Sequence, residues 1–398
     1  METYRVAILG CRGRGTAAGR AYHAHPRTEV VALCDLVQER LDTLGDELGV
    51  AARFTDLDEM IVQTQPDLVA IPTGTEFHYP LCMRVLEHGV HIEVEKPMCV
   101  DLEGTTAVMA KAKEKGVRVA VHHQGRVGAF MRAMHKAFTE GAIGELRYIN
   151  SRGKAYYGGL GLMNIGTHQL NNMLKFAGHC RTVSAVALTD GHPITPKDVV
   201  PSPLGMGTIA GESITATLHF DNGVTANLLQ HRFPGGTNPV MEIVGTEGKL
   251  FGSACLLIKG GAWHLSQPVY IPEGKPDQWE PLEPVYPEHY DRSSADLSAF
   301  RFAEPAKIDD YWFVEEYVSA LDQDRDHECS GAEAHHIVGI MMGIFESAAY
   351  GKRVDLPQKC LEHPLLRWRR EEGLAPPEAM PRDYNEWLAA EDQRLGRK

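Results

Sequence analysis

A cluster of glycines near the start of the chain is the first feature whose residue types and spacing suggest chemistry. It directly follows the apolar run at 6–9. Glycines let backbone N–H groups approach a pyrophosphate closely at the start of a helix. Asp35 follows the next apolar run, 20 residues after Gly15, where a carboxylate can accept hydrogen bonds from ribose hydroxyls. The pattern predicts a dinucleotide-binding turn formed by Gly10, Arg12, Gly13, Arg14 and Gly15.

The same residues bear on which dinucleotide binds. The Asp35 carboxylate repels a 2′-phosphate, so NAD is favoured over NADP. Arg12 stands where the usual Gly-x-Gly-x-x-Gly spacing has its second glycine, and together with Arg14 it keeps NADP open as an alternative.

Short apolar runs alternate with helix-like segments over residues 4–121, and these elements position the glycine turn. The runs are continuous rather than alternating, as expected for parallel strands that are buried on both faces. Helix-like segments at 79–88 and 102–115 each end at a glycine. Repeated β-α-β units predict a doubly wound parallel sheet. The predicted strands are Val6–Leu9, Val30–Cys34, Leu68–Ile71, Val90–Val94 and Val117–Val121.

The pattern changes after residue 122. Residues 213–220 alternate apolar and polar, Asp221-Asn222-Gly223 is a hairpin turn signal, and an apolar strand returns. Residues 267–290 are rich in Pro and Glu and are expected to be irregular, and a helix is expected around 337–344. We therefore expect a dinucleotide domain at 1–122, a substrate-binding and oligomerisation domain at 123–356, and a tail at 357–398 that packs on the surface or on a neighbouring subunit.

Composition excludes several classes of protein. With 398 residues, 43% hydrophobic and 23% charged, the chain is neither fibrous nor largely disordered. A formal net charge of −13 argues against nucleic acid or an anionic membrane as partner. The absence of a secretory signal and of 18 consecutive apolar residues, with eight dispersed cysteines, leads us to expect a cytoplasmic protein. No ligand spacing such as Cys-x-x-Cys or His-Glu-x-x-His occurs, so we expect no metal.

Three later motifs carry a family resemblance. They are the segment 67–78, the triplet Glu95-Lys96-Pro97, and the segment 161–171 with His168. In these motifs the chain resembles the Gfo/Idh/MocA family of NAD(P)-dependent oxidoreductases over roughly residues 4–357. The resemblance implies an α/β protein: an N-terminal Rossmann domain with a doubly wound parallel sheet, and a C-terminal α+β domain with an open mixed sheet. It also implies a sugar or polyol substrate held between the domains, and a homo-oligomer, a dimer or a tetramer, formed through the open sheet.

The resemblance also implies roles for individual residues. Lys96 would polarise the substrate oxygen, next to a proline that the family implies is cis. His168 is the best acid/base candidate, because its unperturbed pKa is close to neutrality. Asn164 stands where the family usually has Asp; it can hydrogen-bond substrate but cannot take a proton, and Asn171 likewise replaces a frequent Asp.

Two sets of binding residues complete the predicted site. Those expected to face the cofactor, besides the glycine turn and Asp35, are Thr73, Thr75, His78, Glu95, Lys96, His123 and Arg126. Those expected to bind substrate are Lys154, Tyr156, Tyr157, Asn164 and His168.

The resulting hypothesis is an NAD-dependent oxidoreductase. It would transfer a hydride between nicotinamide C4 and a secondary alcohol or ketone of a sugar, inositol or sugar derivative. Two alternatives stay open. One is an NAD-recycling glycoside hydrolase that works by oxidation, elimination, water addition and re-reduction; the other is a non-catalytic dinucleotide-binding protein.

Overall fold

The chain forms two compact units in a computed structural model. The first comprises Met1–Cys99, Gly104–Ala129 and Tyr286–His335, and the second comprises Val100–Glu103, Phe130–Val285 and His336–Lys398. The residues described are 3–232, 240–252, 257–259, 262–264, 269–272, 274, 278, 280–286 and 305–397.

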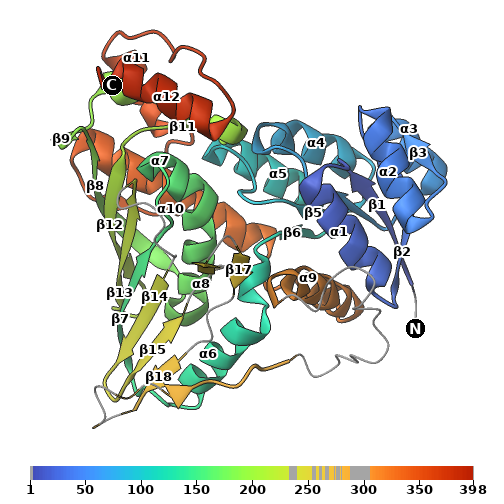
Figure 1. Cartoon of the computed structure of the whole chain (residues 1–398), viewed down its shortest axis with the longest axis horizontal. Coiled ribbons are helices and arrows are strands. Elements are labelled where there is room, and N and C mark those ends of the chain that lie inside the picture. Colours follow the sequence, from blue (N-terminus) through green and yellow to red (C-terminus); the bar gives the residue numbers. More distant parts are fainter. Residues whose placement is uncertain are drawn as a thin grey trace. The chain divides into compact units, whose positions relative to one another are not determined.

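A six-stranded parallel sheet forms the centre of the first unit (Figure 1). Its strand order is β3-β2-β1-β4-β5-β6, so the chain moves outward in one direction and then in the other from β1. This order is that of a doubly wound sheet and confirms the predicted fold class. The strands are β1 (Tyr4–Leu9), β2 (Thr28–Cys34), β3 (Arg53–Phe54), β4 (Leu68–Ile71), β5 (His91–Val94) and β6 (Val119–Val121).

Both faces of this sheet are buried, which explains why its strands are continuously apolar. Val6 and Ile8 belong to one hydrophobic cluster, while Ala7 and Leu9 belong to another. The sequence prediction missed β3 and α3, although Asp56 caps α3 by accepting a hydrogen bond from the Glu59 N–H at 2.8 Å. The helices are α1 (Gly13–Ala24), α2 (Gln38–Leu48), α3 (Leu57–Thr64), α4 (Thr75–Glu87) and α5 (Leu102–Lys115), followed by a 3₁₀ turn at Gln124–Arg126.

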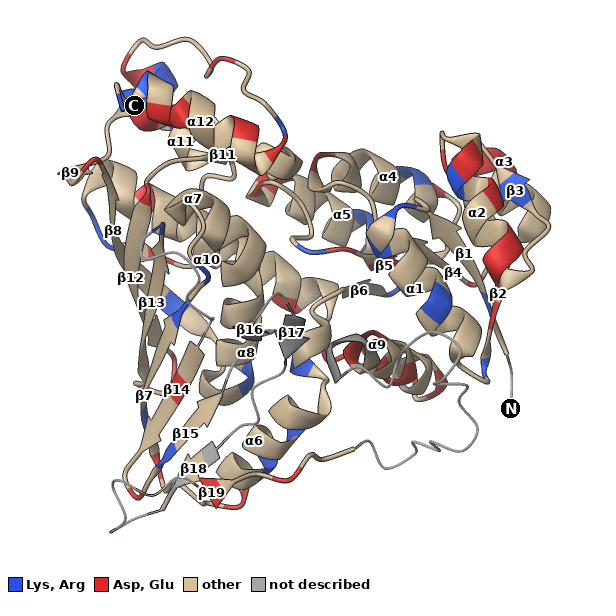
Figure 2. Cartoon of the chain, viewed as in Figure 1, with Lys and Arg blue, Asp and Glu red and all other residues tan. Residues whose placement is uncertain are grey.

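One helix from late in the chain also belongs to the first unit. Helix α9 (Pro305–Asp322) buries Tyr311, Trp312 and Tyr317 in the same cluster as Tyr22 of α1. The units therefore differ from the expected division at residue 122, because the aromatic residues of α9 complete the core of the dinucleotide unit. Figure 2 shows that α9 also carries many acidic residues.

A large mixed sheet forms the second unit. Its order is β19-β18-β15-β14-β7-β13-β12-β8-β20, with β9 on β8, and β7 pairs parallel with β13 while β12 pairs antiparallel with β13. Burial alternates along β12, so one sheet face is covered and the other is open. The strands are β7 (Leu146–Arg152), β8 (Cys180–Thr189), β9 (His192–Pro193), β12 (Ser213–Phe220), β13 (Thr225–His231), β14 (Val240–Gly245), β15 (Lys249–Gly252), β18 (Val269–Ile271), β19 (Glu280–Pro281) and β20 (Val354–Asp355).

Helices cover one face of this sheet. Two small ribbons accompany it, β10 (Val200–Pro201) with β11 (Thr208–Ile209) and β16 (Leu257–Lys259) with β17 (Ala262–His264). The segment expected to be irregular contributes β18 and the edge strand β19, and other parts of it lie outside the described residues. The helices are α6 (Ala129–Thr139), α7 (Gly158–Gly161), a π-helix at Leu162–Gly166, α8 (Thr167–Ala177) and α10 (Gly331–Tyr350), with 3₁₀ turns at Pro196–Asp198 and Pro203–Gly205.

The C-terminal segment is part of the second unit's core. It contains α11 (Pro364–Glu371) and α12 (Tyr384–Arg394), and it buries Leu365 and Trp387 completely. The Trp387 indole N–H also donates to the Pro201 carbonyl at 2.8 Å. These residues therefore pack against the chain's own second unit. Within the described residues, no helix is both long enough and apolar enough to cross a membrane.

Candidate active site

The glycine turn joins β1 to α1. Gly10 has φ of +106°, a conformation that side chains rarely adopt, and a Cβ on it would lie 3.0 Å from Thr73 Cγ2. Gly15 has no room for a Cβ beside the Gly10 backbone. Helix α1 begins at Gly13 with no acidic residue in its first turn. The turn therefore leaves a helix N-terminus of positive dipole next to a closely approachable backbone, as an anionic pyrophosphate requires.

Asp35 lies directly after β2, as predicted, beside the glycine turn. Its Oδ2 accepts the Cys11 N–H at 2.7 Å and its Oδ1 accepts the Val37 N–H at 2.9 Å. Arg40 approaches the carboxylate to 3.6 Å. Two backbone donors fix the position of the negative charge, so that the carboxylate can face ribose hydroxyls and repel a 2′-phosphate.

Three further predicted cofactor residues lie after β4. Thr73 follows the strand, and among the described residues its buried Oγ1 has no hydrogen-bond partner. Thr75 begins α4 and is buried. His78 is fully buried, its Nδ1 is 3.0 Å from the Pro97 carbonyl and its Nε2 is 3.1 Å from the Thr73 carbonyl, and burial lowers its pKa. The ring thus holds the Thr73 loop against the segment after β5, and the orphaned Thr73 hydroxyl fits a polar ligand.

The Glu95-Lys96-Pro97 triplet follows β5, and the Lys96–Pro97 peptide bond is cis, as the resemblance implied. Glu95 Oε2 accepts the Lys96 N–H at 3.1 Å, and Glu95 Oε1 accepts a hydrogen bond from Arg14 Nε at 2.5 Å. Burial raises the pKa of Glu95, but the charge of Arg14, followed by those of His122 and Lys96, lowers it to about 2. Glu95 is therefore ionised, and it joins the glycine turn to Lys96.

Arg14 is held on a second side by Asp310 of α9, whose Oδ1 is 3.0 Å from Arg14 Nη2. With its guanidinium between two carboxylates, Arg14 is poorly suited to a 2′-phosphate, which supports NAD over NADP.

His123 and Arg126 lie just after β6. His123 is buried, and burial, then the charge of Lys96, lowers its pKa to about 3, so that its ring is neutral. Arg126 is also buried and binds Glu333, which lies in the part of α10 that belongs to the first unit, through two contacts of 2.9 and 3.0 Å. Arg126 is thus committed to a carboxylate of its own unit.

In the second unit, a continuous helical run carries the predicted acid/base residue His168 and the predicted substrate-binding residue Asn164. Asn164 lies in the π-helix and His168 lies in the first turn of α8. Most of α8 is buried, and His168 is only 9% exposed. Short π-helical segments occur often at functional sites, because the extra residue per turn redirects the side chains. The run therefore presents Asn164 and His168 from a rigid, buried element.

Sequence reasoning missed the residue that supports this run. The Gln230 amide lies against Gly153, Gly161 and Gly166; a Cβ on Gly153 would lie 1.9 Å from Gln230 Oε1. Its Nε2 donates to Gln169 Oε1 at 2.6 Å, next to His168. The three glycines were the available sequence signal for a buried side chain at this place, since their missing side chains leave the space that the Gln230 amide occupies.

The remaining predicted substrate residues differ in exposure. Lys154 and Tyr156 are partly buried, and the Tyr156 ring packs edge-to-face on Tyr384, with centroids 5.4 Å apart. Tyr157 is fully buried, and its hydroxyl donates to Glu391 at 2.9 Å. Tyr157 is therefore assigned to the core rather than to substrate, because α12 encloses it.

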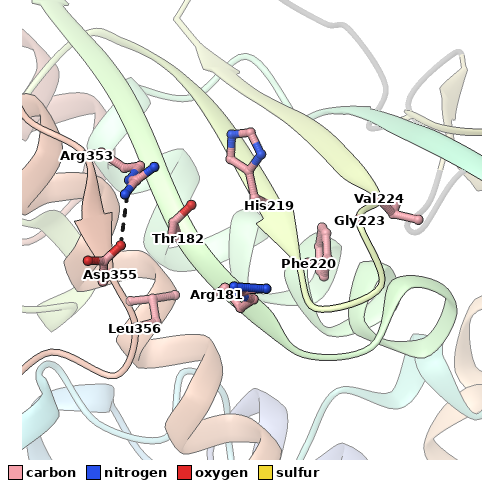
Figure 3. Close-up of a pocket in the computed structure, with 9 residues that line it drawn as sticks. All are labelled: Arg181, Thr182, His219, Phe220, Gly223, Val224, Arg353, Asp355 and Leu356. Carbon is pink, nitrogen blue, oxygen red and sulfur yellow. Dashed lines mark ion pairs between the residues drawn. The ribbon is translucent and has the colours of Figure 1, made fainter.

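Within the part of the chain that the structure describes, the predicted residues line neither a cluster of metal-ligating side chains nor the cavity found in the second unit. Within the described part of the chain, no group of three or more His, Cys, Asp or Glu side chains could hold a metal ion. A cavity of about 530 Å³ opens in the second unit beside β8, β12 and β20, and Figure 3 shows Arg181, His219 and Arg353 around it. Arg353 pairs with Asp355 at 3.6 Å, and none of the predicted site residues lines this cavity.

Family models match both units. A model described as "Oxidoreductase family, NAD-binding Rossmann fold" matches residues 4–123, and one described as "GFO/IDH/MocA C-terminal domain" matches residues 131–251. Together these matches cover more than half of the chain. The chain belongs to the Gfo/Idh/MocA oxidoreductase family. Its first unit is thus the NAD-binding domain of this family, in agreement with the geometry of the glycine turn and Asp35.

Individual relatives in the family share only about a quarter of their residues with this chain. The chain is 26% identical over 192 residues to D-glucoside 3-dehydrogenase of Escherichia coli strain K12, covering 44% of this chain and 54% of that protein. It is 27% identical over 324 residues to dTDP-3,4-didehydro-2,6-dideoxy-alpha-D-glucose 3-reductase of Streptomyces violaceoruber, covering 75% and 85%. The chain thus spans about half of the length of the first relative. A structure of levoglucosan dehydrogenase with NADH and levoglucosan matches with a TM-score of 0.71 at 20% identity, covering 90% of this chain and all of that one, and this likeness shows the fold.

Proposed function

We propose that this chain is an NAD-dependent oxidoreductase acting on a secondary alcohol or ketone of a sugar, inositol or sugar derivative. The observation that carries the proposal is the direct path from the glycine turn through Arg14 and Glu95 to Lys96. This path supports the proposal because it connects the backbone of Lys96 to the dinucleotide turn within one unit. NAD, when bound, supplies the acceptor or donor of a hydride at nicotinamide C4.

The chain's own residues would supply the acid–base chemistry. Lys96 presents a cation to the substrate oxygen, where negative charge develops as the C–H bond breaks. His168 accepts the hydroxyl proton in oxidation and returns it in reduction. Asn164 orients the substrate by hydrogen bonding, since an amide does not take up a proton at neutral pH.

The cofactor residues divide into contacting and positioning groups. The backbone of residues 10–15 would hold the pyrophosphate, Asp35 the ribose, and the Thr73 hydroxyl a polar group of the cofactor. His78 and Arg126 would act by holding the loops on which these contacts depend, since their side chains bind protein groups.

A substrate panel tests the proposal. NADH formation at 340 nm is followed with NAD⁺ and a series of sugars, inositols and glycosides, using the wild-type protein, Lys96→Met and His168→Ala. We expect turnover with at least one member of the panel, and a loss of about 10²–10³-fold in kcat for Lys96→Met. Lys113→Met, on the exposed side of α5, is the matched control and should keep full activity. Wild-type inactivity on the entire panel would contradict the proposal.

Because Asn164 stands where the family usually has Asp, NAD-recycling glycoside hydrolysis stays open as an alternative, and the same assay can test it. A glycoside hydrolase that recycles NAD would release the aglycone without net NADH, and removal of NAD would abolish release. Aglycone release measured beside the absorbance distinguishes the two reactions on the same samples.

The open face of the large sheet supports a homo-oligomer. Four exposed apolar residues lie on this face, each on a different strand of the sheet, and exposed apolar area on one face marks interaction surfaces. They are Tyr148, Val186, Leu229 and Phe251, with exposures of 38, 56, 36 and 36%. Val186→Asp with Leu229→Asp should convert a dimer or tetramer into monomers in size-exclusion chromatography with light scattering. Val62→Asp, at an exposed position of α3, should not.

A further inference from the structure

A buried histidine in the first unit lies between two carboxylates. His122 Nδ1 is 2.5 Å from Glu93 Oε1, and His122 Nε2 is 2.8 Å from Asp310 Oδ1. All three residues are at most 5% exposed, and the buried Tyr22 hydroxyl donates to the other oxygen of Glu93. Because both ring nitrogens face carboxylate oxygens, both donate, and the ring is an imidazolium cation.

The same Asp310 oxygen continues the path toward the proposed site. Asp310 Oδ1 also accepts from Arg14 Nη2 at 3.0 Å, and Arg14 Nε donates to Glu95 Oε1 at 2.5 Å. Glu95 Oε2 accepts the Lys96 N–H at 3.1 Å. Charged side chains therefore alternate in sign from Glu93 through His122, Asp310 and Arg14 to Glu95, and Glu95 then binds the Lys96 backbone.

Such a row of buried ion pairs is a costly way to stabilise a hydrophobic core. Buried ion pairs often contribute no more to stability than apolar residues of similar volume, because each charge loses its hydration. What these ion pairs do supply is a fixed position for the Arg14 guanidinium. Asp310 and Glu95 hold the guanidinium of Arg14 from two sides, and that grip fixes Glu95, whose second oxygen fixes the Lys96 backbone.

We propose that Asp310 is a positioning residue, backed by His122, that holds Arg14 on Glu95 and thereby sets the site of the glycine turn and Lys96. Its effect on catalysis rests on the proposed function, whereas its effect on dinucleotide binding does not. The carboxylate that completes the site thus comes from α9, a helix separated by 296 residues in sequence from Arg14.

The molecule contains a matched control on the same helix. Glu315 of α9 binds the buried His25, with 2.9 Å between Oε2 and Nε2, at the C-terminal end of α1. Glu315→Gln and Asp310→Asn each neutralise a carboxylate of α9 that contacts a buried histidine. Only Asp310 also contacts Arg14.

The experiment compares NADH binding, measured by fluorescence, and kcat for both variants. For Asp310→Asn we expect at least a fivefold rise in the Kd for NADH and at least a tenfold loss of kcat at saturating substrates. Glu315→Gln should stay within twofold in both, whatever its effect on Tm. In an Arg14→Gln background, Asp310→Asn should change the Kd for NADH and kcat by less than a further twofold, because Asp310 acts by holding Arg14.

Three results would overturn the proposal: Asp310→Asn within twofold of wild type, equal losses in Glu315→Gln, or losses that multiply in the double variant. If Asp310→Asn does not fold, His122→Gln, which leaves the Asp310 carboxylate on Arg14, should raise the Kd at least threefold, and an unchanged Kd would refute the role of His122. If wild-type protein binds NADH but oxidises no substrate, the proposed function fails while the binding measurements still decide the role of Asp310.

Discussion

The Cβ position of Gly15 lies 1.7 Å from the carbonyl oxygen of Gly10. No side chain fits there, because the atom facing it is backbone and cannot rotate away. The turn between β1 and α1 is therefore as tight as its atoms allow. Gly13, in the same turn, has no atom within 4 Å of its Cβ position.

This contrast predicts opposite results for two similar substitutions. Gly15→Ala should lower the free energy of unfolding by about 3 kcal/mol or more and abolish NADH binding, since the turn must open to admit the methyl group. Gly13→Ala should leave the apo protein unchanged or stabilise it by up to about 1 kcal/mol, since alanine favours a helix. Urea unfolding of the apo proteins measures both, and equal losses would show that the turn does not constrain Gly15.

The dinucleotide turn was predictable because its signals are local. A strand, a glycine cluster, a helix and Asp35 follow one another within about 30 residues, and each is recognisable from its neighbours. Helix α3 was missed despite its Asp56 cap, because it follows a strand of only two residues, Arg53–Phe54. The sequence therefore predicts the elements whose regular pattern extends over several residues of a strand or several turns of a helix.

What the sequence could not show are contacts between distant segments. Asp310 meets Arg14 only because the aromatic residues of α9 pack into the first unit. Tyr157 resembled a substrate residue in sequence, yet Glu391 and Trp387 of α12 enclose it. Neither spacing nor periodicity encodes which segments will pack together over such separations.

Asp35 should determine the choice of cofactor. Asp35→Ser removes the charge that repels a 2′-phosphate and leaves Arg40 nearby, so the ratio of kcat/KM for NADP⁺ to that for NAD⁺ should rise at least tenfold. Glu39→Gln, an exposed acid in the first turn of α2, is the control and should leave the ratio unchanged. An unchanged ratio in Asp35→Ser would show that another residue selects the cofactor.

The charge of His122 should make stability depend on alkaline pH. Burial lowers the pKa of His122, but the charge of Glu93 and hydrogen bonds to Asp310 and Glu93 outweigh it and raise the pKa from 6.5 to about 9, with Arg14 opposing. A histidine whose pKa is raised in the folded state adds its full contribution to the free energy of unfolding at pH values below its unfolded-state pKa. This contribution is lost as the pH rises through the folded-state pKa. Stability from His122 should therefore decline between about pH 6.5 and pH 9.

Thermal unfolding across that window tests this dependence. Wild-type Tm should fall from pH 6.5 to pH 9.5, and His122→Gln should remove much of this slope. The groups facing the ring are Glu93 of β5, Asp310 of α9 and Arg14 of α1, and Tyr22 lies behind Glu93. Parallel slopes in the two proteins would assign the pH dependence to other groups.

Trp387 should be a principal anchor of the C-terminal segment. Its ring is fully buried, it packs on the Tyr157 ring with centroids 4.9 Å apart, and its indole N–H binds the Pro201 carbonyl. Trp387→Ala should therefore cost about 3–5 kcal/mol of unfolding free energy, whereas Leu361→Ala, at a partly exposed position of the same segment, should cost less than about 1 kcal/mol.

The same substitution should also affect the residues that α12 supports. Tyr384 accepts the Tyr157 N–H at 3.0 Å at the start of the run that carries Asn164 and His168. Since loss of Trp387 loosens that start, Trp387→Ala should raise KM for the sugar while the Kd for NADH, bound by the other unit, stays constant. A constant KM in a folded Trp387→Ala protein would mean that α12 stabilises the second unit without shaping its site.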